Sequence, residues 1–138
     1  MKTSARNQFK GTITEIKKGQ INSEIVLSID QGVILKAIIT NESVDEMSLV
    51  VGEEAYAIIK ASFVMVAKDK PTNISTRNII ETKVLEVKNG MVNGELKMLM
   101  GDQILTAVIT EEAVEELDFK VGDTVYALIK ANFVILAK

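Results

Sequence analysis

The stretch YAIIKASFVMVAK at residues 56–68 returns at the end of the chain as YALIKANFVILAK at residues 126–138. Other segments repeat in the same order, and Ser-x-Arg-Asn opens both copies, at Ser4–Asn7 and Ser75–Asn78. Residues 4–68 align with residues 75–138 when one residue near Gly32 is omitted. The sequence therefore predicts two homologous domains, 4–68 and 75–138, joined by the polar linker 69–74 that holds the only proline.

Each copy alternates apolar and polar residues with a period close to two and is rich in β-branched residues, which predicts strands. A polar segment from Thr40 to Ser43 has the composition of a helix start, and the helix is expected to continue to about Leu49. The fold class predicted is mainly β, with two tandem OB-like five-stranded barrels that carry one short helix each. Barrels of this size are small, so each should bury apolar surface against the other copy or another chain. The strands expected in the first copy are Phe9–Lys17, Ile21–Ile29, Val33–Ile39, Ala55–Lys60 and Phe63–Ala67.

Composition excludes several classes of function. The 138 residues have a net charge of −3 and lack cysteine and histidine, which removes disulfides, thiolate metal sites and the usual general base. No signal peptide or membrane-spanning apolar run is recognisable, so a cytoplasmic protein without a membrane partner is expected.

Catalysis and nucleic-acid binding are both weakly supported. Acidic residues recur in both copies, but acids on strands and helix surfaces usually form a solvated face, and no catalytic or nucleotide-binding motif is present. A barrel that binds single strands needs stacking aromatics and a basic groove, whereas aromatics make up 4% of this acidic chain. The acids concerned are Glu15, Glu24, Glu42 and Glu46, with their counterparts Glu86, Glu95, Glu112 and Glu116.

Oxyanion binding is the function that the repeated residues favour. The only two arginines, Arg6 and Arg77, occupy matching places, and a guanidinium offers a planar fork of donors to a tetrahedral oxyanion. Ser4 should lie on the same side of an extended strand as Arg6, and Lys60 supplies a second cation. Taken singly, Thr40 could be only a helix cap, Lys60 a surface lysine and Arg6 half of a surface ion pair. Repetition of Arg, Thr and Lys in both copies favours the ligand-binding interpretation.

These motifs, in this order and twice over, resemble the molybdate-binding Mop (molbindin) family in its tandem di-Mop form. The resemblance implies a cytoplasmic protein that binds molybdate or tungstate for storage and homeostasis, without an organic cofactor. It also implies a homotrimer with oxyanions held between domains. Nucleic acid and membrane are not expected as partners, and no enzyme activity is implied.

The resemblance also implies the binding residues, copy by copy. In the second copy the counterpart of Ser43 is Ala113, and Glu111 replaces Asn41, so that site should lack one hydroxyl. If first copies face second copies, Ser75 and Arg77 pair with Thr40, Ser43 and Lys60, while Ser4 and Arg6 pair with Thr110, Ala113 and Lys130. The oxyanion residues are Ser4, Ala5, Arg6, Thr40, Ser43, Lys60, Ala61, Ser62, Ser75, Thr76, Arg77, Thr110, Ala113, Lys130 and Ala131. Further sites near a threefold axis would use Gly19, Ile21, Asn22, Gly90, Val92 and Asn93.

A fully deprotonated dianion suits such donors, since none of them accepts a proton, and partly protonated phosphate should bind poorly. The leading hypothesis is an oxyanion storage protein. The alternative is a molybdate-sensing module that acts through a protein partner. A DNA-binding regulator would need a further domain, for which the two copies are expected to leave no room.

Overall fold

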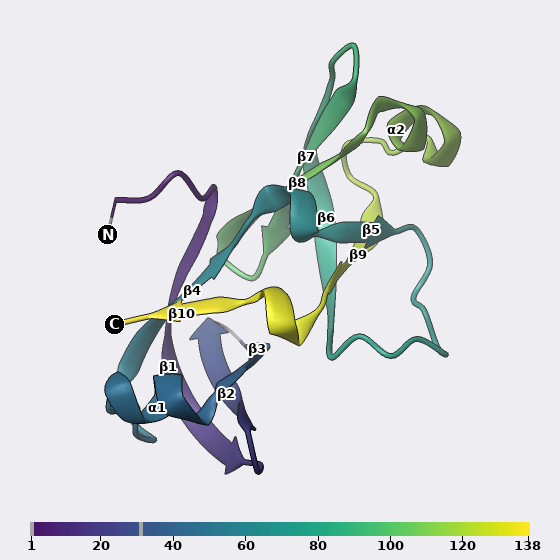
Figure 1. Ribbon diagram of the computed structural model, residues 1–138. Helices are drawn as coiled ribbons and strands as arrows, with labels where there is room; N and C mark the ends of the chain where they lie inside the picture. The colour runs from purple at the N-terminus through teal and green to yellow at the C-terminus, as the bar shows by residue number, and fades with distance from the viewer. Residues whose placement is uncertain (1, 31) are drawn as a thin grey trace.

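A computed structural model describes residues 2–30 and 32–138 of the chain, and the two repeats form two curled five-stranded sheets (Figure 1). The predicted fold class, mainly β with two tandem OB-like five-stranded units and few short helices, is confirmed, and each sheet is curled into a half-barrel. The elements of the first repeat are β1 (Asn7–Lys18), β2 (Asn22–Asp30), β3 (Val33–Thr40), α1 (Asn41–Glu46), β4 (Glu54–Ile59), the 3-10 turn η1 (Ala61–Phe63) and β5 (Met65–Ala67). Those of the second are β6 (Asn78–Asn89), β7 (Asn93–Met100), β8 (Gln103–Thr110), α2 (Glu111–Leu117), β9 (Thr124–Ile129), η2 (Ala131–Phe133) and β10 (Ile135–Ala137).

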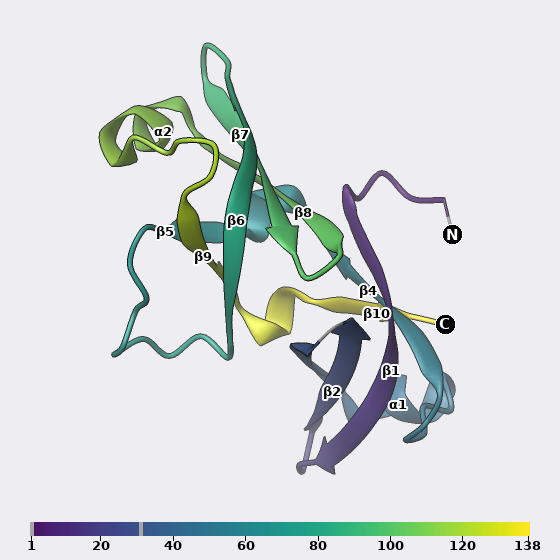
Figure 2. The ribbon, with the colours of Figure 1, turned by 180° about the vertical axis from the view of Figure 1, so that it is seen from behind.

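The last strand of each repeat belongs to the sheet of the other repeat. The strand orders are β10-β4-β1-β2-β3 and β5-β9-β6-β7-β8, and all neighbouring strands pair antiparallel. In the view from behind, the C-terminal end of the chain runs beside β4 and β1, in the half built by the first repeat (Figure 2). This exchange ties the two repeats together through backbone hydrogen bonds.

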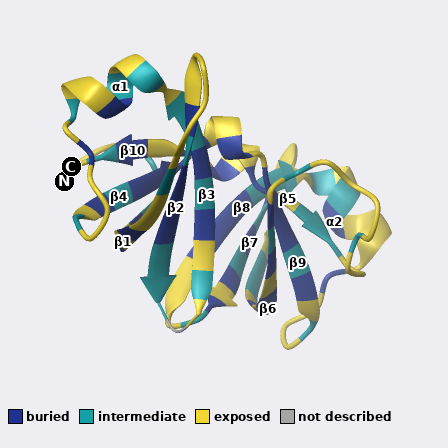
Figure 3. Cartoon of the chain, turned by 90° about the horizontal axis from the view of Figure 1, so that it is seen from below, coloured by how far each residue is buried: buried dark blue, intermediate teal, exposed yellow. Residues whose placement is uncertain are grey.

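A single hydrophobic cluster runs through both repeats. It joins Phe9, Ile13 and Leu35 of the first to Val84 and Leu105 of the second, among others. Buried positions alternate with exposed ones along the strands (Figure 3), as the period of two predicts. The expected burial of each repeat against the other is therefore found.

Two of the expected element boundaries are wrong. The first helix ends at Glu46, not near Leu49, because Ser48 adopts a left-handed φ of 51° and turns Leu49 into the core. Phe63 is not in a strand. Its N–H donates to the carbonyl of Lys60 at 2.9 Å in η1, and the last strand begins only at Met65.

The ends of β3 and β8 lead directly into the helices. Thr40 and Thr110 are the N-cap residues of α1 and α2, and each hydroxyl accepts the N–H of the residue three positions later at 3.1 Å. Helix capping, the simpler of the two interpretations weighed for Thr40, is therefore one role that both threonines have.

Candidate functional site

The candidate anion site is a surface pocket of about 230 Å³ where the first repeat meets β8 of the second. Its cations are Arg6 and Lys60, its hydroxyls belong to Ser4 and Ser62, and Ala5, Ala61 and Val108 complete the lining. None of the described residues that line this pocket is a carboxylate. Six of the residues expected from sequence are thus gathered in one place.

Strand pairing explains why these segments meet. Asn7, the first residue of β1, pairs with Ile59, the last residue of β4. The Ser4–Arg6 segment therefore enters the sheet where the Lys60–Ser62 segment leaves it. The second repeat repeats this arrangement, because Asn78 pairs with Ile129 and Lys130 follows.

Within one chain, this pairing places Lys60 of the same repeat beside Ser4 and Arg6. The pairing of Ser4 and Arg6 with Lys130 between facing copies stays a prediction. Thr110 and Ala113 do lie nearby, in an adjoining hollow of about 420 Å³ that shares Ser62 and Val108 with the pocket. The start of α2 in the second repeat therefore lies next to the pocket that Arg6 lines.

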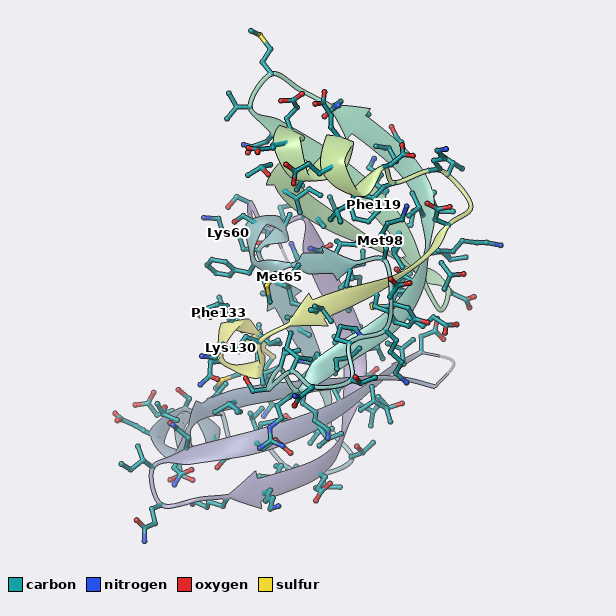
Figure 4. All side chains as sticks on the ribbon, turned by 90° about the vertical axis from the view of Figure 1, so that its right-hand side faces the viewer. Lys60, Met65, Met98, Phe119, Lys130 and Phe133 are labelled. Atoms are coloured by element: carbon teal, nitrogen blue, oxygen red, sulfur yellow. The ribbon has the colours of Figure 1, made fainter. Side chains whose placement is uncertain are left out.

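The two site lysines lie beside a pair of aromatic rings. The Nζ atoms of Lys60 and Lys130 lie 5.5 Å and 5.8 Å from the ring centroids of Phe63 and Phe133. The two rings are 4.8 Å apart at an interplanar angle of 33°. Figure 4 shows both lysines, Phe133 and Met65 on the same side of the molecule. The lysines are therefore held by cation–π contacts on one exposed face.

Each motif arginine faces a glutamate of the other repeat. Arg6 forms an ion pair and hydrogen bond with Glu95 of β7, and Nε of Arg77 lies 3.9 Å from a carboxylate oxygen of Glu24 of β2. The interpretation of Arg6 as half of an ion pair is thus also realised. The glutamates lie in register with pocket residues, Glu95 opposite Val108 and Glu24 opposite Ile38.

The motif asparagines have a role that sequence reasoning did not assign. The Asn7 side-chain amide donates to the Thr106 carbonyl and accepts the Thr106 N–H, both at 2.8 Å. The Asn78 amide makes the same two bonds, also at 2.8 Å, to the backbone of Lys36. Both asparagines are buried. The signal was present in the sequence as the fourth residue of Ser-x-Arg-Asn in both copies.

The remaining predicted residues occupy several places. Ser75 and Ala131 hold the positions of Ser4 and Ala61 in the second repeat, and the Thr76 hydroxyl donates to the carbonyl of Ile129 at 2.9 Å. Ser43 lies at the start of α1, where its hydroxyl accepts from that of Thr40 at 2.9 Å. In Figure 1, α1 and α2 lie at opposite ends of the molecule.

The residues predicted for axial sites form two matching hairpin turns. The N–H of Gly19 donates to the Asn22 carbonyl, and that of Gly90 to the Asn93 carbonyl, each at 2.9 Å. Ile21 and Val92 are exposed at the tips. The turn at Gly19 and Asn22 borders a hollow of about 320 Å³ that Arg77 also lines. Asn93 lines the hollow beside Thr110 and Ala113.

The helix start of the second repeat differs from that of the first in charge. In the first, the amide of Asn41 donates to the carbonyl of Gly19 at 2.9 Å. In the second, a hydrogen bond with the Glu115 side chain and the charge of that residue raise the pKa of Glu111 above its ordinary value. The two repeats therefore present different helix starts to an anion.

Comparison with known proteins places the chain in a family. The TOBE domain model matches residues 3–66 and 74–136. The chain belongs to the TOBE-domain family, in the tandem di-Mop organisation that the repeated motifs indicate.

Three similar proteins are informative. The structure of the cytoplasmic molybdate-binding protein ModG with molybdate bound superposes with a TM-score of 0.94 at 38% identity, over 99% of both chains. Molybdenum-pterin-binding protein MopA of Rhodobacter capsulatus is 40% identical over 99% of this chain and 52% of its own length. Molybdenum transport protein ModE of Azotobacter vinelandii is 33% identical over 99% of this chain and 51% of its own length. The chain thus spans about half the length of these two curated relatives.

Proposed function

We propose that this protein binds molybdate or tungstate in the pocket lined by Ser4, Arg6, Lys60 and Ser62. The observation that carries the proposal is the convergence of two cations and two hydroxyls in one pocket. Its described lining residues include no carboxylate, and the one carboxylate that contacts a pocket cation is that of Glu95, on Arg6. The likeness to a molybdate-bound structure over nearly the whole chain supports it.

The donor chemistry sets the expected selectivity. Arginine, lysine and hydroxyl groups can all donate to the oxygens of a dianion, and a guanidinium is suited to two of them at once. Hydrogen phosphate carries a proton that needs an acceptor, and among the side chains that line this pocket only the hydroxyl oxygens of Ser4 and Ser62 can accept it. Molybdate and tungstate should therefore bind more tightly than phosphate.

The biological role proposed is cytoplasmic storage and homeostasis of the oxyanion, with binding and no catalytic step. No organic cofactor, nucleic acid or membrane partner is part of the proposal. Among the described residues, no helix is long and apolar enough to cross a bilayer.

We also propose a homotrimer in which neighbouring chains complete the sites. Several apolar side chains are exposed on the face that carries the site lysines, among them Phe63, Met65 and Phe133. Exposed apolar surface of this kind favours association. Sedimentation at low micromolar concentration should show a trimer without folded monomer, and a stable 15.1 kDa monomer that binds molybdate would contradict intersubunit sites.

Isothermal titration tests the proposed function directly. Molybdate, tungstate, sulfate and phosphate are titrated at equal ionic strength, with molybdate and tungstate expected to bind far more tightly than phosphate. Phosphate affinity comparable to that of molybdate would overturn the proposal. Metal analysis of the protein purified from cells distinguishes molybdenum from tungsten.

A further inference from the structure

We propose that Asn7 and Asn78 are positioning residues, which hold each Ser-x-Arg segment against the edge strand of the other repeat and so set the geometry of the anion site. This inference rests on the proposed function. It concerns how the site is assembled and names residues that do not themselves contact the anion.

The first step is the nature of the contact. β8 and β3 each form one edge of their sheets, so alternate backbone groups on each have no ladder partner on the outer side. The Asn7 amide satisfies both groups of Thr106, and the Asn78 amide satisfies both groups of Lys36. Asn7 is fully buried, with 0% exposure, so these bonds are shielded from competing water.

The second step is where the contact lies. Asn7 directly follows the Ser4–Arg6 segment and pairs with Ile59, which directly precedes Lys60. Its amide partner Thr106 lies two residues before Val108, the β8 residue that lines the pocket. One side chain therefore fixes the three segments that meet at the pocket.

The third step is that the second repeat makes the same strand pairing and the same amide contact. Asn78 follows the Ser75–Arg77 segment and pairs with Ile129, which precedes Lys130. Its partner Lys36 lies two residues before Ile38, and Ile38 and Arg77 line the same hollow. The same amide contact at two independent places supports a role in placing the arginine.

Asparagine is suited to this task because its amide donates and accepts side by side. Aspartate keeps the shape but, when ionised, can only accept, and it would face the Thr106 carbonyl. A protonated aspartic acid again donates and accepts. Burial should raise the pKa of an aspartate introduced here, so that protonation becomes accessible under mildly acidic conditions.

The test compares Asn7→Asp, Asn7→Ala and the wild type by molybdate titration at about pH 8 and about pH 5.5, conditions that should bracket the raised pKa. Affinities are expressed relative to the wild type at the same pH, which removes the protonation of molybdate itself. Asn7→Asp should bind at least about tenfold more weakly at the higher pH and recover most of that loss at the lower pH. Asn7→Ala should be weak at both.

Thr82→Val is the matched control for general destabilisation. Thr82 is buried and its hydroxyl donates to the Val125 carbonyl at 3.1 Å within one sheet, away from the pocket. This variant should lower the unfolding temperature and leave the relative affinity unchanged. Equal loss of affinity in Thr82→Val and Asn7→Ala would overturn the positioning role, as would a pH-independent ratio for Asn7→Asp.

Hydrogen exchange at the Thr106 amide tests the Asn7–Thr106 contact in the absence of any anion. Asn7→Ala should exchange faster than the wild type at this amide, and unchanged exchange would overturn the inference. Failure of the wild type to bind any oxyanion would instead count against the proposed function, and with it the anion-positioning role. The two failures are thus told apart.

Discussion

The guanidinium of Arg6 in the first repeat is ion-paired with the carboxylate of Glu95 in the second, and Arg77 faces Glu24 in the same way. Each arginine proposed to bind the oxyanion therefore already has an anionic partner from the other repeat. An incoming anion must share or displace that partner. The free energy of the Arg6–Glu95 ion pair is modest, because the Arg6 side chain is half exposed to solvent.

Glu95→Gln should tighten molybdate binding about two- to fivefold, because the arginine loses a competing charge worth up to about 1 kcal/mol. Titration calorimetry measures the change. The matched control is Glu86→Gln, which alters net charge equally but removes a partner of Lys88 and Lys97 instead. Weaker binding in Glu95→Gln would mean that the glutamate holds Arg6 in its binding position.

Arg6→Lys should weaken the site about tenfold to hundredfold while keeping its charge. Lysine is a point charge and cannot offer the planar fork, so one charge-assisted hydrogen bond of about 1.5–3 kcal/mol is lost. Lys10→Gln is the control, since Lys10 lies on β1 but pairs with Glu54 outside the pocket. Unchanged binding in Arg6→Lys would remove Arg6 from the site.

The pair Ala113→Ser with Glu111→Asn should tighten binding near Thr110. The first change restores the hydroxyl that Ser43 supplies in the first repeat, and the second removes a carboxylate from the helix start. Ser43→Ala should weaken binding near Thr40. Isotherms that show one uniform class, unmoved by either variant, would contradict the two unequal classes expected from the sequence.

The Glu111 carboxyl predicts a specific pH dependence of stability. Its raised pKa means that the folded chain binds this proton more tightly than the unfolded chain. The associated stabilisation is complete below the ordinary glutamate pKa and is lost as pH rises through the raised value. Glu111→Asn should flatten this part of the profile of unfolding temperature against pH, and a profile of unchanged slope in this variant would contradict the prediction.

Because the last strands are exchanged, a destabilising substitution in the last strand of one repeat should destabilise the sheet of the other repeat. Leu136 is buried in β10, so Leu136→Ala should cost about 2–5 kcal/mol and speed amide exchange in β4 of the first repeat. Val66→Ala in β5 is the reciprocal control and should speed exchange in β9. Faster exchange in β9 without any change in β4 on Leu136→Ala would contradict the topology.

The sequence by itself determined the repeats, nearly all the strands and the donor chemistry of the proposed site. These properties are local: a period of two places apolar residues on one face, and residue type decides whether a side chain donates or accepts. The Ser-x-Arg and Lys-Ala motifs could therefore be assigned to one kind of site without a structure. The helix end at Glu46 was missed because the left-handed φ of Ser48, which follows it, depends on the packing of Leu49 in the core.

Only the tertiary structure decided which of the two sheets the last strand of each repeat joins. β5 and β10 have similar sequences, and backbone hydrogen bonds do not depend on side-chain identity, so either strand could pair with β4 or β9. The structure selects the exchanged pairing, and the β1–β4 register then places Lys60, and not Lys130, beside Arg6. The Asn7 contact with Thr106 spans 99 positions of sequence. Such a contact exists only once both repeats have folded against each other.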